Sequence, residues 1–216
     1  MASSAIAMSA VTIRPSDKEV FLLSKHRLEG LSDALFAIVM TLLVLDLRVP
    51  ELGSDVGSRQ LLHALASVWR VYFSFFVSFA LSSVFWMFQQ TVFKAMRKLD
   101  RIGTLLSLLT LMFVSLLPFS AAVLARYLRA ALPIYFANQF AIAGTLALLW
   151  WRTVRTGNLE DIEPATRTRF TVRLYALALA CLVAALISAV NSPYAFVGFA
   201  LVMLLGRLYR KKALRL

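Results

Sequence analysis

Residues that catalyse reactions or bind metals are scarce in this 216-residue sequence, which has one cysteine, two histidines and only 16% charged residues. Cys181 lies alone within an apolar run, so the chain cannot form an internal disulfide bond. No HExxH, GxSxG, CxxC or P-loop pattern occurs. We therefore expect a protein that is not an enzyme and that binds no metal or cofactor.

Apolar residues make up 60% of the chain, whereas soluble domains contain roughly 45–50% apolar and about 25% charged residues. Apolar runs of roughly 20 residues recur, which is the length that crosses about 30 Å of hydrocarbon. The net charge of +12 comes from basic residues clustered in short loops between these runs, a pattern that orients membrane proteins. These features predict an all-α membrane protein that does not bind nucleic acid.

We expect six transmembrane helices per subunit. They are predicted at residues 28–49, 67–90, 102–125, 133–151 and 170–190, with a sixth from the turn at 191–194 to about 209. The resulting domain division is an N-terminal cytoplasmic tail (1–26), a six-helix transmembrane domain (27–209) and a basic C-terminal tail (210–216). Residues 1–20 lack the apolar core of a signal peptide.

The distribution of basic residues predicts the orientation. Of the 23 Lys and Arg residues, eighteen fall in the two tails and in the second-to-third and fourth-to-fifth connectors, and five fall on the other side. Basic residues concentrate on the cytoplasmic side, so both termini are expected in the cytoplasm. His26 and His63 then lie on opposite sides of the membrane and cannot share a site.

The segment RLEGLSDALFAIVMTLLVLDLRVP (Arg27–Pro50) is the most informative part of the chain. It is predicted to be helical to about Asp46, with Ile38, Leu42 and Leu45 at spacings that place them on one face. Such a face suits a helix that lines a pore, and it equally suits any helix packed in a membrane bundle. Thr41 stands beside this face, where it either faces the pore or bonds to its own backbone.

Ionisable groups within a membrane are costly and indicate function, and the first helix carries Glu29, Asp33 and Asp46. At 100° per residue, Asp33 lies roughly 140° from Ile38, so it is expected to bind donors on neighbouring helices and hold the helix in place. The alternative is that Ser32 and Asp33 form a helix N-cap. Asp46 either concentrates cations at an outer mouth or is a solvated end residue.

Three segments resemble one known family. RLEGLSD (Arg27–Asp33) resembles the RxxxFSD signature of the transmembrane protein 175 family, and the helix that follows is similar to the family's first helix. SFALSSVFW and SLLPFSAAVL resemble its second-helix segment and its third-helix Pro-Phe segment. The family consists of potassium-permeable channels of bacteria, archaea and animal endosomes and lysosomes, and the likeness covers roughly residues 27–125.

The resemblance implies a homotetramer with the first helix of each subunit lining a central pore. It implies that Ile38 forms the constriction and that Leu42 and Leu45 form hydrophobic layers beyond it. From its position beside this face, Thr41 is included in the expected pore constriction. The signature residues expected to form a structural polar network are Arg27, Ser32, Asp33, Trp86 and Gln89. Leu31 replaces the signature phenylalanine, and Gln89 and Gln90 stand where family members usually carry a histidine pair.

The resulting functional hypothesis is passive conduction of potassium, and of other monovalent cations, through a hydrophobic constriction. The expected setting is the cell inner (plasma) membrane, with membrane lipids as partners. The alternatives are a proton-coupled carrier, which needs a relay of titratable groups through the bilayer, and a non-conducting membrane scaffold.

Overall fold

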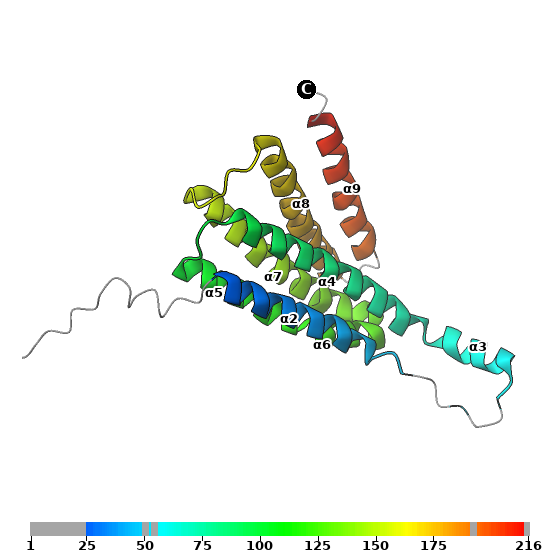
Figure 1. Cartoon of the computed structure of the whole chain (residues 1–216). Helices are drawn as coiled ribbons and strands as arrows, with labels where there is room; N and C mark the ends of the chain where they lie inside the picture. Colours follow the sequence, from blue (N-terminus) through cyan, green and yellow to red (C-terminus); the bar gives the residue numbers. More distant parts are fainter. Residues whose placement is uncertain (1–24, 49–51, 53–55, 191–193, 214–216) are drawn as a thin grey trace, which may run out of the picture.

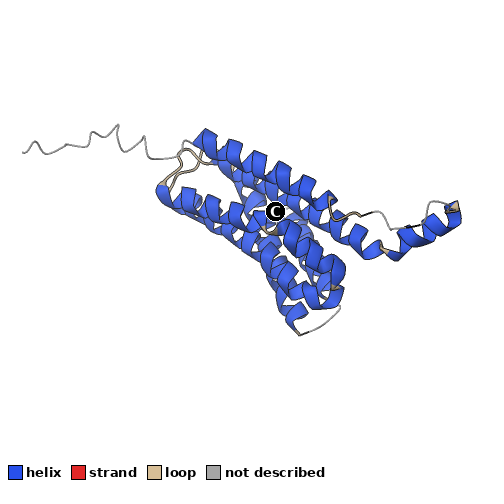
Figure 2. Cartoon of the chain, turned by 90° about the horizontal axis from the view of Figure 1, so that it is seen from below, coloured by secondary structure: helices blue, strands red, loops and turns tan. Residues whose placement is uncertain are grey.

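The computed structural model describes residues 25–48, 52, 56–190 and 194–213, with side chains described up to Leu204. The predicted tail at 1–26 therefore lies almost wholly outside the described residues, as do the last three residues of the tail at 210–216. All the regular elements in the described part are helices (Figures 1 and 2). They are α2 (Lys25–Val44), α3 (Ser58–Ser67), α4 (Trp69–Ala95), α5 (Arg101–Ser115), α6 (Leu117–Arg126), α7 (Leu128–Arg155), α8 (Pro164–Ala189) and α9 (Ala195–Ala213).

Helix α7 is the centre of the bundle, because it packs against α4, α5, α6 and α8. Its buried side chains include Tyr135, Ile142, Leu146 and Trp150, all at most 1% exposed. Helix α2 packs against α4, α5 and α6, and α9 packs on α8 (Figure 1). Helix α2 therefore sits at the edge of the subunit, with one side left uncovered by the other described helices.

In the described part of the chain, four segments are long and apolar enough to cross a membrane: Trp69–Ala95, Arg101–Arg126, Leu128–Arg155 and Pro164–Ala189. Helix α9 contributes a shorter apolar stretch, Ala195–Leu204. Helix α2 has 20 residues, which is about 30 Å at 1.5 Å per residue, but its first half carries Arg27, Glu29 and Asp33. The chain is a multi-pass helical membrane protein.

The predicted third span is broken into two helices. Helix α5 ends at Ser115 and α6 begins at Leu117, because Pro118 has no N–H to continue the ladder of helical hydrogen bonds. The region before the second span is also more structured than expected, since α3 forms a separate helix with no buried residue. Helix α3 projects away from the bundle in both views (Figures 1 and 2).

The α4–α5 and α7–α8 connectors are joined to each other. Arg97 N–H donates to the carbonyl of Asn158 at 3.1 Å and Glu160 N–H donates to that of Ala95 at 2.8 Å. Gly157 ends α7 with a φ of 66°, and the N–H groups of Gly157 and Asn158 bond back to Val154 and Thr153. This arrangement is a Schellman motif, which requires the left-handed conformation that glycine adopts easily.

Asp100 stabilises the same end of the bundle in two ways. Its side chain caps α5 by accepting from Gly103 N–H at 2.9 Å, and its second carboxylate oxygen pairs with Arg152 at the end of α7. Burial alone raises the pKa of Asp100, but the Arg152 guanidinium and the Gly103 N–H outweigh it, so the pKa lies below its ordinary value. A Cβ at Gly103 would lie 2.8 Å from the Asp100 carboxylate, so this position needs glycine to keep the cap.

Asp100→Ala is expected to lower stability by about 1–2 kcal/mol because it removes both the cap and the ion pair. Asp100→Asn is expected to cost less, since asparagine caps helices well. Because the folded pKa of Asp100 is depressed, the benefit of its charge is present above the ordinary pKa of 3.8 and is lost as the pH falls below it. Thermal unfolding of the parent protein and of Asp100→Asn, at neutral and at acid pH, measures this contribution. The same difference in unfolding temperature between the two proteins at both pH values would contradict it.

Candidate pore face on the first helix

Helix α2 divides into a buried side and an exposed side. The buried side carries Leu28, Phe36, Val39 and Leu43, which are at most 2% exposed and belong to the packed interior. Together with a buried serine midway between the first two, these residues recur every three or four positions, as expected of one helix face. The opposite side remains exposed along the length of the helix, although one of its residues, Asp33, binds α4.

The predicted aliphatic residues lie on that exposed side. Ile38 is 57% exposed, Leu42 is 42% exposed and Leu45 is 68% exposed, whereas their neighbour Val39 is 2% exposed. Leu45 lies one residue beyond the end of α2, in a turn in which its N–H bonds to Leu42. The expectation of a helix reaching Asp46 is therefore too long by two residues.

Asp33 is bound by donors from α4. Its carboxylate oxygen Oδ1 accepts from the indole N–H of Trp86 at 2.8 Å and from the side-chain amide of Gln90. Asp33 nevertheless remains exposed on the outside of the single subunit. A carboxylate therefore lies at the surface of the subunit, where the apolar second half of α2 begins.

The glutamine that binds Asp33 is Gln90 and not Gln89, which sequence reasoning placed in the polar network. Trp86 and Gln90 are four residues apart and share a face of α4, whereas Gln89 is rotated by about 100° from Gln90 and points inward. Gln89 is fully buried, and neither of its side-chain polar atoms has a partner among the described residues. The four-residue spacing from Trp86 was the sequence signal that identifies Gln90.

The capping interpretation of Ser32 and Asp33 is wrong, because α2 begins at Lys25 and both residues lie well inside it. Ser32 is fully buried, and its hydroxyl has no partner in the described part of the chain. Arg27 lies exposed near the start of the helix. Lys25 donates from Nζ to the carbonyl of Met96 at 2.7 Å, which joins the start of α2 to the end of α4.

The two remaining predicted residues lie near the far end of the helix. The Thr41 hydroxyl donates to the backbone carbonyl of Ile38 at 2.7 Å, and the residue is exposed beside the aliphatic face. Asp46 is half-buried in the turn after α2. Neither the aliphatic residues nor these polar groups form a metal cluster, and no cluster of His, Cys, Asp and Glu occurs elsewhere among the residues described.

These features define a multi-pass helical membrane protein with an aliphatic helix face that the described residues leave exposed. Comparison with known proteins places it further. Residues 27–118 match the family model described as the endosomal/lysosomal potassium channel TMEM175. A protein of Streptomyces collinus named as a potassium channel is 37% identical over 158 residues, covering 68% of this chain and 75% of the relative.

Two further comparisons agree with this placement. The crystal structure of a lysosomal potassium-selective channel TMEM175 homologue from Chamaesiphon minutus superposes with a TM-score of 0.65 and 30% identity, covering 88% of this chain and 97% of the other. The human endosomal/lysosomal proton channel TMEM175 is 32% identical over 160 residues, which is 66% of this chain and 30% of the human protein. The chain belongs to the TMEM175 family, and these relatives are named as channels and not as enzymes.

Proposed function

We propose that this protein is a potassium-permeable cation channel that conducts passively through a hydrophobic constriction. Membership of the TMEM175 family and the potassium-channel relatives support the activity. The exposed side of α2 supports the location of the pore. The constriction consists of Ile38 from each subunit, with Leu42 and Leu45 in successive layers beyond it.

The exposed carboxylate of Asp33 is the main observation that supports placing the pore along α2. In one subunit by itself, the surface of α2 and α4 that holds Asp33 would face lipid, and an ionised group in contact with hydrocarbon is unfavourable by several kcal/mol. Asp33 keeps two hydrogen bonds to α4 but remains exposed. A second copy of the chain or a water-filled path has to cover this surface, which supports placing α2 inside an assembly and not against lipid.

In the proposed assembly, four copies surround one axis and each contributes its α2. Asp33 lies roughly 140° around the helix from Ile38, so it faces the subunit contact while Ile38 faces the axis. Its bonds to Trp86 and Gln90 hold α2 against α4 and keep Ile38 on the axis. Asp46, near the other end of α2, contributes negative charge to the outer mouth.

An apolar ring selects among cations through hydration. An ion that enters the ring loses part of its water, and aliphatic side chains supply no oxygen ligands in exchange. Potassium is larger than sodium and holds its water less strongly, so it passes more readily. Tightening or drying of the same ring closes the path.

The proposed topology has six transmembrane helices, formed by α2, α4, α5 with α6, α7, α8 and α9. Both the tail at 1–26 and the tail at 210–216 are placed in the cytoplasm, because eighteen of the 23 basic residues lie on that side. The membrane is the inner (plasma) membrane of the cell. The channel domain is the segment 27–209.

Ion flux into liposomes that contain the purified protein tests the function. Potassium and caesium are expected to enter faster than sodium, and flux is expected to follow the ion gradient with no added proton gradient. Uptake that requires a proton gradient would instead indicate a coupled carrier. Liposomes that remain impermeable to all three ions would indicate a non-conducting scaffold.

A further inference from the structure

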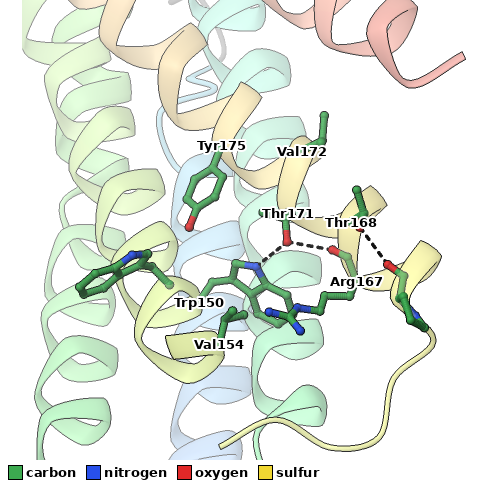
Figure 3. Close-up of a pocket in the computed structure, with 9 residues that line it drawn as sticks. Trp150, Val154, Arg167, Thr168, Thr171, Val172 and Tyr175 are labelled. Carbon is green, nitrogen blue, oxygen red and sulfur yellow. Dashed lines mark hydrogen bonds between the residues drawn. The ribbon is translucent and has the colours of Figure 1, made fainter. Parts of the chain in front are cut away.

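A groove between α7 and α8 has the shape and chemistry of a phospholipid site. Figure 3 shows its polar end, a cavity of about 350 Å³. An adjoining apolar cavity of about 570 Å³ continues along the same two helices and shares Trp151 and Tyr175 with the first. The residues that line the two cavities on α7 are Phe140, Gly144, Ala147, Leu148, Trp150, Trp151 and Val154.

The walls of the groove are continuous helix faces. On α8, Arg167, Thr171, Tyr175 and Ala178 recur at intervals of four, four and three residues and so lie along one side of the helix. From Phe140 to Val154 on α7 the groove extends about 21 Å at 1.5 Å per residue. One leaflet of a bilayer contributes about 15 Å of hydrocarbon, so the groove reaches from the headgroup region to the middle of the membrane.

The apolar part of the groove leaves free space beside a glycine of α7. A Cβ added at Gly144 would have only the Phe140 ring in contact, at 3.9 Å. Phe140, Leu148 and Ala178 surround this space with apolar atoms. An acyl chain is the ligand that fits a narrow apolar groove open to the lipid phase.

The other end of the groove is aromatic and basic. Trp150 donates from its indole N–H to Thr171 at 2.8 Å, which fixes the ring, and in Figure 3 the side chain of Arg167 extends toward it. Arg167 also lines a neighbouring cavity of about 220 Å³, and Lys94 is another of the residues that line it. Arg155 lies over the ring of Trp151, with its Cζ 4.9 Å from the centroid.

Two of the acidic groups at this end of the bundle are paired with arginines other than Arg167. Asp100 pairs with Arg152 and Glu160 lies 3.9 Å from Arg97. Glu163 accepts from the Thr166 hydroxyl at 3.2 Å. Arg167 lines both cavities at this end, and the residues that line them include Lys94 but no aspartate or glutamate.

We propose that this groove binds one anionic phospholipid, with an acyl chain along Gly144 and the phosphate at Arg167. Arginine forms paired hydrogen bonds to phosphate, and basic pockets between transmembrane helices on the cytoplasmic side bind anionic headgroups. Indole rings favour the same interfacial depth. The lipid joins the end of α7 to the start of α8.

Native mass spectrometry of the full-length protein tests the proposal by titration with phosphatidylglycerol and phosphatidylcholine of equal chain length. The parent protein is expected to prefer phosphatidylglycerol. Arg167→Gln is expected to weaken phosphatidylglycerol binding about five- to tenfold. Phosphatidylcholine binding is expected to weaken less, because its choline group offsets the charge of the phosphate, so the preference for phosphatidylglycerol falls. The matched control is Arg169→Gln, because Arg169 is also exposed but is rotated about 200° from Arg167 around α8.

Gly144→Leu supplies an independent arm, since it fills the apolar groove without changing charge. It is expected to weaken the binding of both lipids equally and to leave the preference for phosphatidylglycerol intact. Equal binding of the two lipids by the parent protein, or equal behaviour of the Arg167→Gln and Arg169→Gln variants, would overturn the proposal. Size-exclusion chromatography shows whether each variant is folded, and no ion flux is measured, so the result is independent of the proposed channel activity.

Discussion

Replacing Ile38 by asparagine is expected to bring the potassium-to-sodium permeability ratio of reconstituted channels down toward one. The preference of the proposed ring depends on its supplying no ligands to a partly dehydrated ion. Asparagine places amide oxygens at the constriction, where they replace lost water and help sodium more than potassium. Sodium flux is therefore expected to rise, and liposome flux with each cation in turn measures it.

Ile134→Asn is the matched control, because Ile134 is also an exposed isoleucine, at 52%, but lies on α7 and away from the α2 face. It is expected to leave the permeability ratio of the parent protein unchanged. If Ile38→Asn keeps the parent ratio, or if both variants change it equally, the constriction does not lie at Ile38.

Removal of the Asp33 carboxylate is expected to have the second large effect. Asp33→Ala loses both acceptor contacts and leaves the Trp86 and Gln90 donors without their partner, at a cost of about 1–3 kcal/mol. Because these bonds hold α2 on α4, potassium flux is expected to be largely lost, together with a lower unfolding temperature. Asp33→Asn keeps an acceptor oxygen and is expected to retain more of both.

Glu29→Gln serves as the control for charge on the same helix, since Glu29 contacts only the exposed His26, at 3.9 Å, among the ion pairs of the described residues. It is expected to conduct like the parent protein. An Asp33→Ala channel with normal flux and normal unfolding would show that the bonds from α4 do not position the pore helix.

Much of the fold follows from local patterns in the sequence. Long apolar runs separated by basic connectors predicted the helices α4, α7 and α8, because a membrane helix satisfies its own backbone hydrogen bonds whatever packs around it. The spacing of Ile38, Leu42 and Leu45 predicted that they share a face, because this depends only on the periodicity of a helix. The length of α2 was less predictable, since the helix ends where hydrogen bonding changes at Val44 and not where apolar residues end.

Contacts between distant segments could not be predicted from such patterns. Asp100 and Arg152 are separated by 52 positions, and only the packing of α5 on α7 brings them together. The assignment of Gln89 in place of Gln90 has a similar origin. Both glutamines suit the signature, and only the packing of α4 shows that Gln90 lies on the same face as Trp86. The groove beside Gly144 also depends on two helices in register, which neither sequence segment reveals alone.

In the proposed channel, copies of Ile38 from different subunits meet at one axis, and cysteine crosslinking in native membranes tests this contact. Cys181 is the one cysteine in the sequence and is fully buried, so Cys181→Ala provides a cysteine-free background. Ile38→Cys is expected to form disulfide-linked dimers on mild oxidation, whereas Leu105→Cys on α5, which is 62% exposed, is expected to remain monomeric. Dimers formed through Leu105→Cys and absent for Ile38→Cys would contradict the claim.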